Sequence, residues 1–370
     1  MITRLYAHNF RCLVNFELAL GQYPSVLLIG KNGAGKTTIR RVLEILQKFA
    51  RGTNRVNDVV TPSERTLWNK DEPMRFEIEA SIGSSHFKYS ISMKYPEGFR
   101  ELQIATEVFE VNGKSQFLRD TAKVTIPRGR EDDSTHFNID WHLAALPIVQ
   151  DRGEDDPLFV FKRWLSRMMI LQPIPSLITG DSEGETFQPR IDVADFGKWF
   201  SGLFATYPES YSTMATYLKE VLPDFKSLRN QPTGRNAKTL EVQFSIDGRD
   251  MVVPFNELSD GEKCFMICAM VLAANETYGP LVCFWDEPDN HLSLSEVGHF
   301  AMNLRKAFEA KKGQFIATSH NPETINQFTG DSTVLIFRRS HLEPTDKKQV
   351  SALQLKQNLV TALVLDDIRP

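Results

Sequence analysis

A glycine-rich segment near the start of the chain has the residue types and the spacing of a phosphate-binding loop. Residues 30–37 read Gly-Lys-Asn-Gly-Ala-Gly-Lys-Thr and fit the pattern G-x-x-x-x-G-K-[ST]. Glycines let backbone N–H groups close on phosphate oxygens, while Lys36 would reach the β- and γ-phosphates and Thr37 would hold Mg²⁺. The segment therefore predicts a site for ATP and Mg²⁺, with these residues around the nucleotide: Asn32, Gly33, Gly35, Lys36, Thr37 and Thr38.

A second set of chemically capable residues lies near the other end of the chain. Asp286 and Glu287 directly follow the apolar run 281–285. Asp286 would organise Mg²⁺ opposite Thr37, and Glu287 would accept a proton from an attacking water. Two adjacent acids can also mark a plain boundary between a strand and a loop. Pro288 and the later His320 favour the catalytic interpretation.

His320 follows another apolar run, residues 315–318. At the end of such a strand, the imidazole would hydrogen-bond the γ-phosphate and the attacking water, and so report which nucleotide is bound. A lone histidine is more often structural, and its place at the end of a strand is what favours the functional interpretation. The sequence thus predicts Glu287 and His320 as the catalytic residues.

The elements around these motifs are those that would position them. Residues 26–29 form an apolar run typical of a buried strand, and residues 38–49 have helical spacing. A strand, a glycine loop and a helix in this order direct the positive helix N-terminus at the phosphates. A glycine-rich turn without a phosphate-binding role is the alternative, and such a turn would not need to lie between a buried strand and a helix.

The order of the motifs resembles that of the ATP-binding-cassette ATPases. After the P-loop come a signature loop at residues 258–263 (Leu-Ser-Asp-Gly-Glu-Lys), a Walker B strand, a D-loop at Asp289 and a switch histidine. The wide gap between P-loop and signature narrows the resemblance to the RecF, SMC and OLD-like group, the stand-alone AAA family ATPases of bacteria. Residues 2–13, with their Asn-Phe-Arg turn, resemble that group's first strand. The resemblance covers roughly residues 1–60 and 240–340.

The resemblance implies an α/β fold: an ABC-type P-loop ATPase head with a mixed sheet, flanking helices, an antiparallel β-arm and a helical insertion. It implies a homodimer in which the signature of one subunit covers the P-loop ATP of the other. Ser259 and the backbone of Gly261 would then donate to the γ-phosphate, and Asp289 would link the two sites. Asp260 stands where transporter cassettes have glycine, and Glu262-Lys263 where they have glutamine-arginine. These departures indicate the subfamily.

The resemblance also implies a glutamine that senses Mg²⁺ after the β-arm. Gln172 is the predicted metal-site residue, and Gln150 is the alternative. Either glutamine could instead be an ordinary surface residue.

Local patterns divide the chain into four predicted ranges. Residues 1–60 hold the P-loop part of the head, and residues 61–130 alternate as an antiparallel β-arm with Asn112-Gly113 as a hairpin turn. Residues 131–238 form a mostly helical insertion, with helical spacing from about 192 to 228. Residues 239–370 begin with a hairpin that turns at Asp247-Gly248, carry the signature, Walker B and switch histidine, and end in a helical tail at 351–365.

The composition is that of an ordinary globular protein. The 370 residues are 41% hydrophobic and 24% charged, with no apolar run of membrane-spanning length and no secretory signal. The four cysteines lack C-x-x-C spacing, so we expect reduced thiols in a cytoplasmic protein rather than a zinc site. The net charge of −4 provides no overall attraction to nucleic acid.

Two functional hypotheses follow. The first is an ATPase that switches a separate effector protein, as stand-alone members of the group do in bacterial anti-phage defence. The second is a RecF-like ATPase of DNA repair or recombination, for which the candidate phosphate contacts are Arg51, Arg55, Lys226, Arg229, Arg235 and Lys238. We expect no nuclease activity, because the acidic stretches at 131–133 and 154–156 lie in loop-like sequence and the segment after His320 is short.

Overall fold

The computed structural model describes residues 1–350 apart from 22, 68, 70–71, 100, 128–133 and 329–331. Within these residues the strands form three sheets, of eight, six and three strands. The predicted helical tail at 351–365 and the acidic residues 131–133 lie outside the described residues.

The six-stranded sheet brings together the strands that carry the predicted motifs. Its order is β10-β14-β15-β3-β16-β17, in which neighbouring strands are parallel except for β16 and β17. The strands are β3 (Ser25–Ile29), β10 (Met169–Leu171), β14 (Val282–Asp286), β15 (Gln314–Thr318), β16 (Thr333–Phe337) and β17 (Asp346–Gln349). The carboxyl ends of β10, β14, β15 and β3 therefore meet at one edge, where ligands bind in open α/β sheets.

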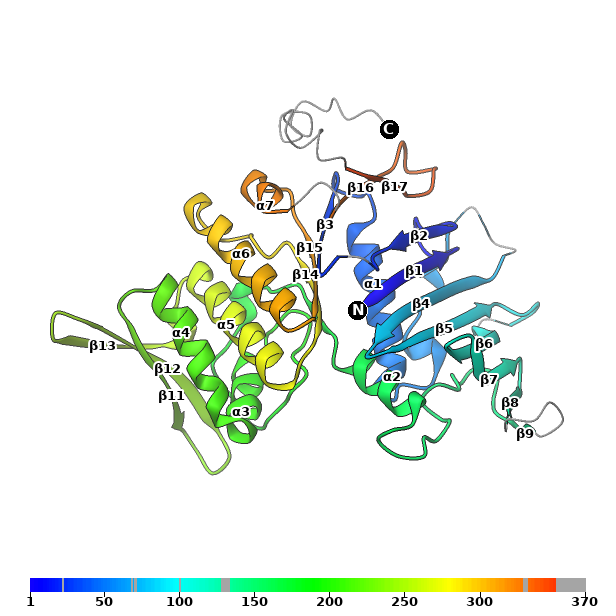
Figure 1. Ribbon diagram of the computed structural model, residues 1–370, viewed down its shortest axis with the longest axis horizontal. Helices are drawn as coiled ribbons and strands as arrows, with labels where there is room; N and C mark the ends of the chain where they lie inside the picture. Colours follow the sequence, from blue (N-terminus) through cyan, green and yellow to red (C-terminus); the bar gives the residue numbers. More distant parts are fainter. Residues whose placement is uncertain are drawn as a thin grey trace.

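This sheet separates two hydrophobic cores. In β3, Val26 and Leu28 belong to one core, and Leu27 and Ile29 belong to the other. Successive side chains of a strand point to opposite faces, so a strand that is apolar throughout contributes to both cores. Figure 1 shows α1 and the eight-stranded sheet on one side and α3 to α6 on the other.

The eight-stranded antiparallel sheet has the order β2-β1-β4-β5-β6-β7-β8-β9. Asn112 and Gly113, with φ of 50° and 75°, connect β6 to β7 and confirm the predicted hairpin turn. β9 pairs with β8 beyond residue 130, where the sequence places the end of the arm. The strands are β1 (Ile2–His8), β2 (Phe16–Ala19), β4 (Met74–Ile82), β5 (Ser85–Lys94), β6 (Gln103–Val111), β7 (Lys114–Asp120), β8 (Lys123–Pro127) and β9 (Ser134–Asn138).

A fully buried ion pair attaches this sheet to the segment that follows it. The Glu107 carboxylate on β6 accepts hydrogen bonds from Tyr89 Oη at 2.8 Å and from the backbone N–H groups of Ala145 and Leu146 at 2.7 Å each. Arg119 Nη1 lies 3.4 Å from the same carboxylate. Buried charges are tolerated when their hydrogen-bonding capacity is satisfied, as it is here for Glu107.

We expect Glu107→Ala to lower the free energy of unfolding by about 3–5 kcal/mol, because it leaves the buried Arg119 charge without its carboxylate partner and two backbone N–H groups without their acceptor. Glu110→Ala on the same strand is the control, since the side chain of Glu110 is half-buried and takes part in none of these contacts. Chemical unfolding followed by circular dichroism measures both. Equal stability of the two variants would refute the role of Glu107.

The second core is built mainly from helices and a small sheet. The three-stranded sheet, β11 (Phe225–Pro232), β12 (Lys238–Ile246) and β13 (Arg249–Pro254), packs against them, and Asp247-Gly248 forms the predicted turn. The helices of the molecule are α1 (Lys36–Ala50), α2 (Pro157–Ser166), α3 (Phe196–Thr206), α4 (Tyr211–Val221), α5 (Asp260–Tyr278), α6 (Leu294–Ala310) and α7 (Pro322–Asn326). None of the helices among the described residues has both the length and the apolarity to cross a bilayer.

The prediction of helix from about 192 to 228 is wrong at its end. The helical part stops at Val221, and Phe225 begins β11, which pairs with β12 along its length. Pairing with a strand that lies later in the chain overrides local helical spacing. The range 131–238 also contains β9 and β10, so its strands belong to all three sheets.

Candidate nucleotide-binding site

The loop between β3 and α1 has a backbone that requires glycine at two places. Gly30 has a φ of 149°, and a Cβ atom there would collide with the carbonyl oxygen of Ile336 on β16. Gly35 caps α1 with a φ of 112°, and a Cβ atom there would lie 2.7 Å from Thr345 Oγ1. The loop is thus held in its turn by contacts with the far end of the chain.

Lys36 lies buried at the start of α1, beneath this loop. Its ammonium group donates to the carbonyl oxygens of Gly30 at 2.5 Å and Lys31 at 3.3 Å, and it lies 2.9 Å from Nε2 of His320. Desolvation lowers the pKa of Lys36, while Glu287 and Asp286 oppose this effect. Desolvation and the nearby Lys36 also lower the pKa of His320, so a neutral imidazole can accept from the ammonium.

Asp286, the last residue of β14, is hydrogen-bonded to Thr37 at the start of α1 and to Thr318 at the end of β15. Its Oδ2 accepts from Thr37 Oγ1 at 3.2 Å, and its Oδ1 accepts from Thr318 Oγ1 at 2.5 Å. Mg²⁺ in such sites takes one or two protein oxygens and completes its shell with water and phosphate. The Thr37 hydroxyl and the Asp286 carboxylate fit this requirement. The described residues contain no cluster of three or more metal-ligating side chains, and this kind of site does not need one.

Glu287 has an unusual backbone conformation for its residue type. Its φ is 51°, a left-handed conformation that side-chain-bearing residues rarely adopt and that is common at functional sites. The backbone N–H donates to Thr318 Oγ1 at 2.9 Å, and the carboxylate accepts from Asn290 Nδ2 at 2.7 Å. Oε1 lies 3.7 Å from His320 Nε2. The two predicted catalytic side chains are therefore neighbours.

A hollow of about 450 Å³ opens over the P-loop. The predicted residues Asn32, Gly33, Gly35, Lys36, Thr37 and Thr38 all line it, as does Glu287. The remaining wall comes from residues that the sequence interpretation did not assign to the nucleotide: Arg11, Cys12, Ser63, Arg65, Leu67, Arg338 and His341. Of these residues, Arg11 alone had a signal in the sequence, because it belongs to the Asn-Phe-Arg turn.

The loop between β16 and β17 forms one side of this wall. Arg338 donates to the carbonyl oxygens of His341 at 2.7 Å, Glu343 at 3.1 Å and Gly33 at 3.4 Å. Thr345 Oγ1 donates to the Ala34 carbonyl at 2.8 Å. This loop thus packs directly on the P-loop and presents the Arg338 guanidinium and the His341 imidazole to the hollow.

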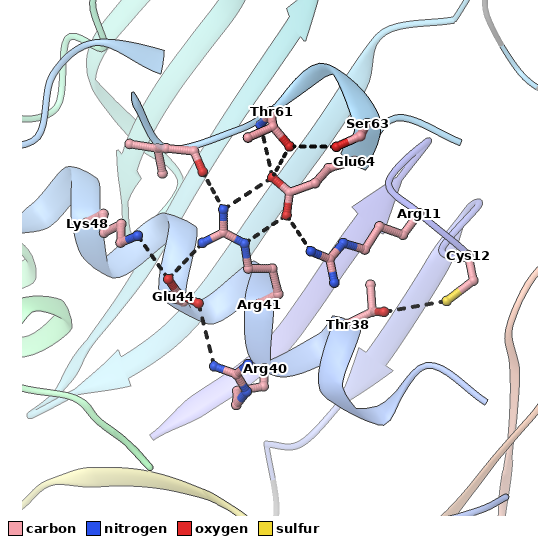
Figure 2. A network of polar contacts seen from close by, with 11 residues as sticks. Arg11, Cys12, Thr38, Arg40, Arg41, Glu44, Lys48, Thr61, Ser63 and Glu64 are labelled. Atoms are coloured by element: carbon pink, nitrogen blue, oxygen red, sulfur yellow. Dashed lines mark hydrogen bonds and ion pairs between the residues drawn. The ribbon is translucent and has the colours of Figure 1, made fainter. Parts of the chain in front are cut away.

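The opposite wall is held by a buried carboxylate. Glu64 accepts from Arg41 Nε and Arg11 Nη2, both at 2.8 Å, and from the backbone N–H of Thr61 at 3.0 Å (Figure 2). These donors lower the pKa of Glu64 to about 2, against the effect of burial, which alone would raise it. The network fixes Arg11 at the rim of the hollow.

The signature residues lie at the start of α5 and do not line this hollow. Ser259 caps the helix, because its hydroxyl accepts from the Glu262 backbone N–H at 3.3 Å while the Glu262 carboxylate accepts from the Ser259 N–H at 2.7 Å. A Cβ atom on Gly261 would lie 3.1 Å from the His291 carbonyl oxygen. Contact of Ser259 and Gly261 with the ATP of a second copy stays a prediction.

Asp289 is buried and bonded within its own chain. Its Oδ2 accepts from Ser319 Oγ and Thr324 Oγ1, both at 2.5 Å. Burial raises the pKa of Asp289, and these two hydroxyl groups oppose that effect. The segment after β14 is thereby tied to the segment after β15 that contains His320.

Gln172 directly follows β10, whose last residue, Leu171, is in register with Trp285 next to Asp286. Its backbone therefore lies at the edge of the sheet where the site is formed. Its exposed side chain lines a different hollow from the one over the P-loop. Gln150 is exposed, lies before α2 and does not directly follow any described strand of this sheet.

Most of the basic residues considered for DNA already have acidic or polar partners. Arg55 pairs with Glu101 at 2.8 Å, Lys226 with Asp250 at 2.7 Å and Lys238 with Glu185 at 3.8 Å. Arg229 donates to Gln243 at 2.9 Å and Arg51 to the Ser166 carbonyl at 3.0 Å. Arg55, Lys226 and Lys238 thus face carboxylates, and contact of this group of basic residues with DNA stays a prediction.

Comparisons with known proteins show the family and the fold of the chain. A family profile described as "AAA domain, putative AbiEii toxin, Type IV TA system" matches residues 25–326, more than half of the chain. An OLD nuclease of Thermus scotoductus is 48% identical over 46 residues, which span 12% of this chain and 8% of the nuclease. The chain thus covers only a small part of that relative's length.

Solved structures show the same fold. An SMC head bound to the C-terminal winged-helix domain of ScpA matches with a TM-score of 0.59 and 14% identity, over 94% of this chain and 98% of that one. An Smc head with an extended coiled coil, bound to the C-terminal domain of ScpA from Pyrococcus furiosus, matches with a TM-score of 0.52 and 14% identity, over 100% and 99%. The predicted fold class, an ABC-type ATPase head with a large antiparallel sheet, is confirmed.

Proposed function

The chain belongs to the AAA-domain family whose profile covers residues 25–326, and on that basis we propose that it is a Mg²⁺-dependent ATPase of the ABC type. One observation carries the proposal. Asp286 ends β14, Glu287 follows it, His320 lies just after β15, and Lys36 and Thr37 begin α1 after the loop that follows β3. These three strands are adjacent and parallel, so the five side chains meet, and Lys36, Thr37 and Glu287 line the hollow. Phosphoryl transfer depends on positioning and on neutralising charge, and this set of side chains offers both.

Each residue has a task that its contacts support. Lys36 exchanges its bonds to the Gly30 and Lys31 carbonyl oxygens for bonds to phosphate oxygens. Thr37 and Asp286 would hold Mg²⁺, which neutralises phosphate charge when it is bound. Glu287 accepts the proton of the attacking water, and neutral His320 orients that water and contacts the γ-phosphate.

We propose that the active species is a homodimer with two ATP molecules at its interface. Ser259 and Gly261 lie at the exposed N-terminus of α5 and do not line the hollow over the P-loop of the same chain. Their hydrogen-bond donors would therefore serve the ATP of a second copy. ATP would favour the closed dimer, and hydrolysis would open it. Asp289 would carry the state of one site to the other, since it is bonded to the Ser319 and Thr324 hydroxyls near His320.

We propose that this cycle switches a separate effector protein in bacterial anti-phage defence. SMC heads of the same fold are seen bound to a domain of another protein, ScpA, which supports a partner-binding role for this type of head. The four cysteines are free and buried, in keeping with action in a reducing cytoplasm. The alternative, a RecF-like DNA-binding ATPase, is disfavoured by the pairing of its candidate basic residues.

We expect the purified chain to hydrolyse ATP slowly and to cut no DNA. Asp286, Glu287 and Asp289 are committed to the nucleotide site, and Asp155 lies exposed in a turn without the rigid support of a two-metal site. Incubation with ATP, Mg²⁺ or Mn²⁺ and several forms of DNA tests this. Cleavage that is lost on changing Asp155, or Asp132 in the segment outside the described residues, would overturn the prediction.

A further inference from the structure

A second hollow, of about 360 Å³, lies between the carboxyl-terminal ends of α1 and α2, β10 and residues 187–192. We call it the basic hollow, because four cationic side chains line it: Lys48, Arg51, Arg167 and Arg190. It shares no lining residue with the hollow over the P-loop.

Among the described residues, two of these four cations have acidic partners and two do not. Lys48 pairs with Glu44 at 2.9 Å, and Arg190 pairs with Asp192 at 2.7 Å. Arg51 donates to the Ser166 carbonyl at 3.0 Å, and the Arg167 guanidinium lies 5.8 Å from the centre of the Tyr278 ring.

Desolvation lowers the pKa of both Arg51 and Arg167, and within the described part of the chain no carboxylate opposes it. Arginine remains protonated even so. The hollow therefore holds two positive charges that have no carboxylate partner in this part of the chain.

Part of the remaining wall is apolar and accessible. Ile174 and Phe187, which line the hollow, are 44% and 41% exposed. Phe187 packs edge-on against Tyr278, the ring beneath Arg167. Such a mixture of apolar surface and a few fixed charges is typical of sites that recognise one compact ligand group.

We propose that the basic hollow docks a segment of a partner protein that combines acidic and apolar side chains. A carboxylate can bind a guanidinium through two parallel hydrogen bonds, and apolar side chains would cover Ile174 and Phe187. Nucleic acid is the weaker candidate, because duplex binding needs a row of free cations, and this chain has a net charge of −4. The identification of the partner as an effector rests on the proposed function. The chemistry of docking does not depend on it.

The basic hollow is connected to the ATP site by two routes. Glu44, at its edge, lies 3.5 Å from Arg40 Nη1, and Arg40 Nε lies 3.6 Å from Asp286 Oδ2 (Figure 2 shows the Glu44 contacts). Arg40 is buried, and its Nε and Nη1 make no hydrogen bond among the described residues. In addition, β10 pairs with β14, and Gln172 at the end of β10 lines the hollow. Occupation of the hollow can thus alter the surroundings of Asp286.

The test is selection of a random peptide display library on the full chain, without nucleotide, followed by fluorescence anisotropy of the selected peptides. We expect the selected peptides to carry acidic and apolar residues, and to bind at least about tenfold more weakly to the double variant Arg51→Ala/Arg167→Ala. Arg163→Ala is the matched control, since Arg163 lies on α2 but does not line the hollow, and it should bind like the parent. A labelled DNA oligonucleotide is titrated in parallel.

Three results would overturn the proposal: selected peptides that are neutral or basic, peptide binding that the double variant retains, or DNA binding that the double variant loses. Arg51 and Arg167 also cap α1 and α2, where cations stabilise helix ends. A thermal unfolding curve of the double variant close to the parent's shows that lost binding does not come from unfolding, and Phe187→Ser, which leaves both caps intact, should weaken the same peptides. The ATPase rate of the parent is measured separately, so failure of the proposed ATPase and failure of the docking site are distinguishable.

Discussion

Replacing Lys36 with alanine should weaken ATP binding by about ten- to a hundredfold, which corresponds to losing the charge-assisted hydrogen bonds of one ammonium group. The reason lies in the geometry. The ammonium is already desolvated and held by the Gly30 and Lys31 carbonyl oxygens beneath the loop, so little ordering remains when phosphate replaces these acceptors. Alanine removes the only side chain that reaches from α1 under the loop toward His320 among the described contacts.

A direct titration with a fluorescent ATP analogue in the presence of Mg²⁺ measures this effect. Lys48→Ala is the control, because Lys48 lies on the same helix and faces Glu44 instead of the P-loop. Parental affinity in Lys36→Ala would refute the assignment of the loop. A drop in both variants would indicate damage to α1 as a whole.

Replacing Glu287 with glutamine should slow hydrolysis by about 10²–10⁴-fold, the usual contribution of a general base, while ATP and Mg²⁺ still bind. Glutamine keeps the size of the side chain and an oxygen for Asn290 Nδ2, so the turn at φ of 51° is retained. Asp286 and Thr37, which would hold Mg²⁺, are unchanged. If ATP closes a dimer, the variant should accumulate in that state because hydrolysis no longer opens it.

Light scattering with and without ATP, together with a phosphate-release assay, checks both parts of this prediction. Glu323→Gln on α7 serves as a control, since this carboxylate does not line the hollow. Hydrolysis at the parental rate would show that Glu287 is not the base. A variant that stays monomeric with ATP would refute the closed dimer, whatever its rate.

The local chemistry of the site could be read from the sequence because each motif is a short run. The P-loop pattern, the acids after the apolar run 281–285 and the turns at Asn112-Gly113 and Asp247-Gly248 depend on a few consecutive residues. Their conformations follow from glycine's freedom at positive φ and from the burial of apolar runs. For the same reason the resemblance to the RecF, SMC and OLD-like group could be stated before the structure.

The tertiary structure decided what lies next to these motifs. Arg338 and His341 come more than three hundred residues after the P-loop, and only the pairing of β16 with β3 brings their loop onto it. Antiparallel pairing with β12 made residues 225–228 a strand in place of the predicted helix, and parallel pairing of β10 with β14 set Gln172 beside a second hollow.

Contacts between residues far apart in the chain cannot be predicted from a local pattern. Such a pattern covers only a few neighbouring residues, and the residue that supplies the hydrogen bond is not among them. Glu287 illustrates the division. Its residue type and its place after a buried strand indicate a base from sequence alone. Its left-handed backbone and its distance of 3.7 Å from His320 exist only because β14 and β15 are parallel neighbours in register.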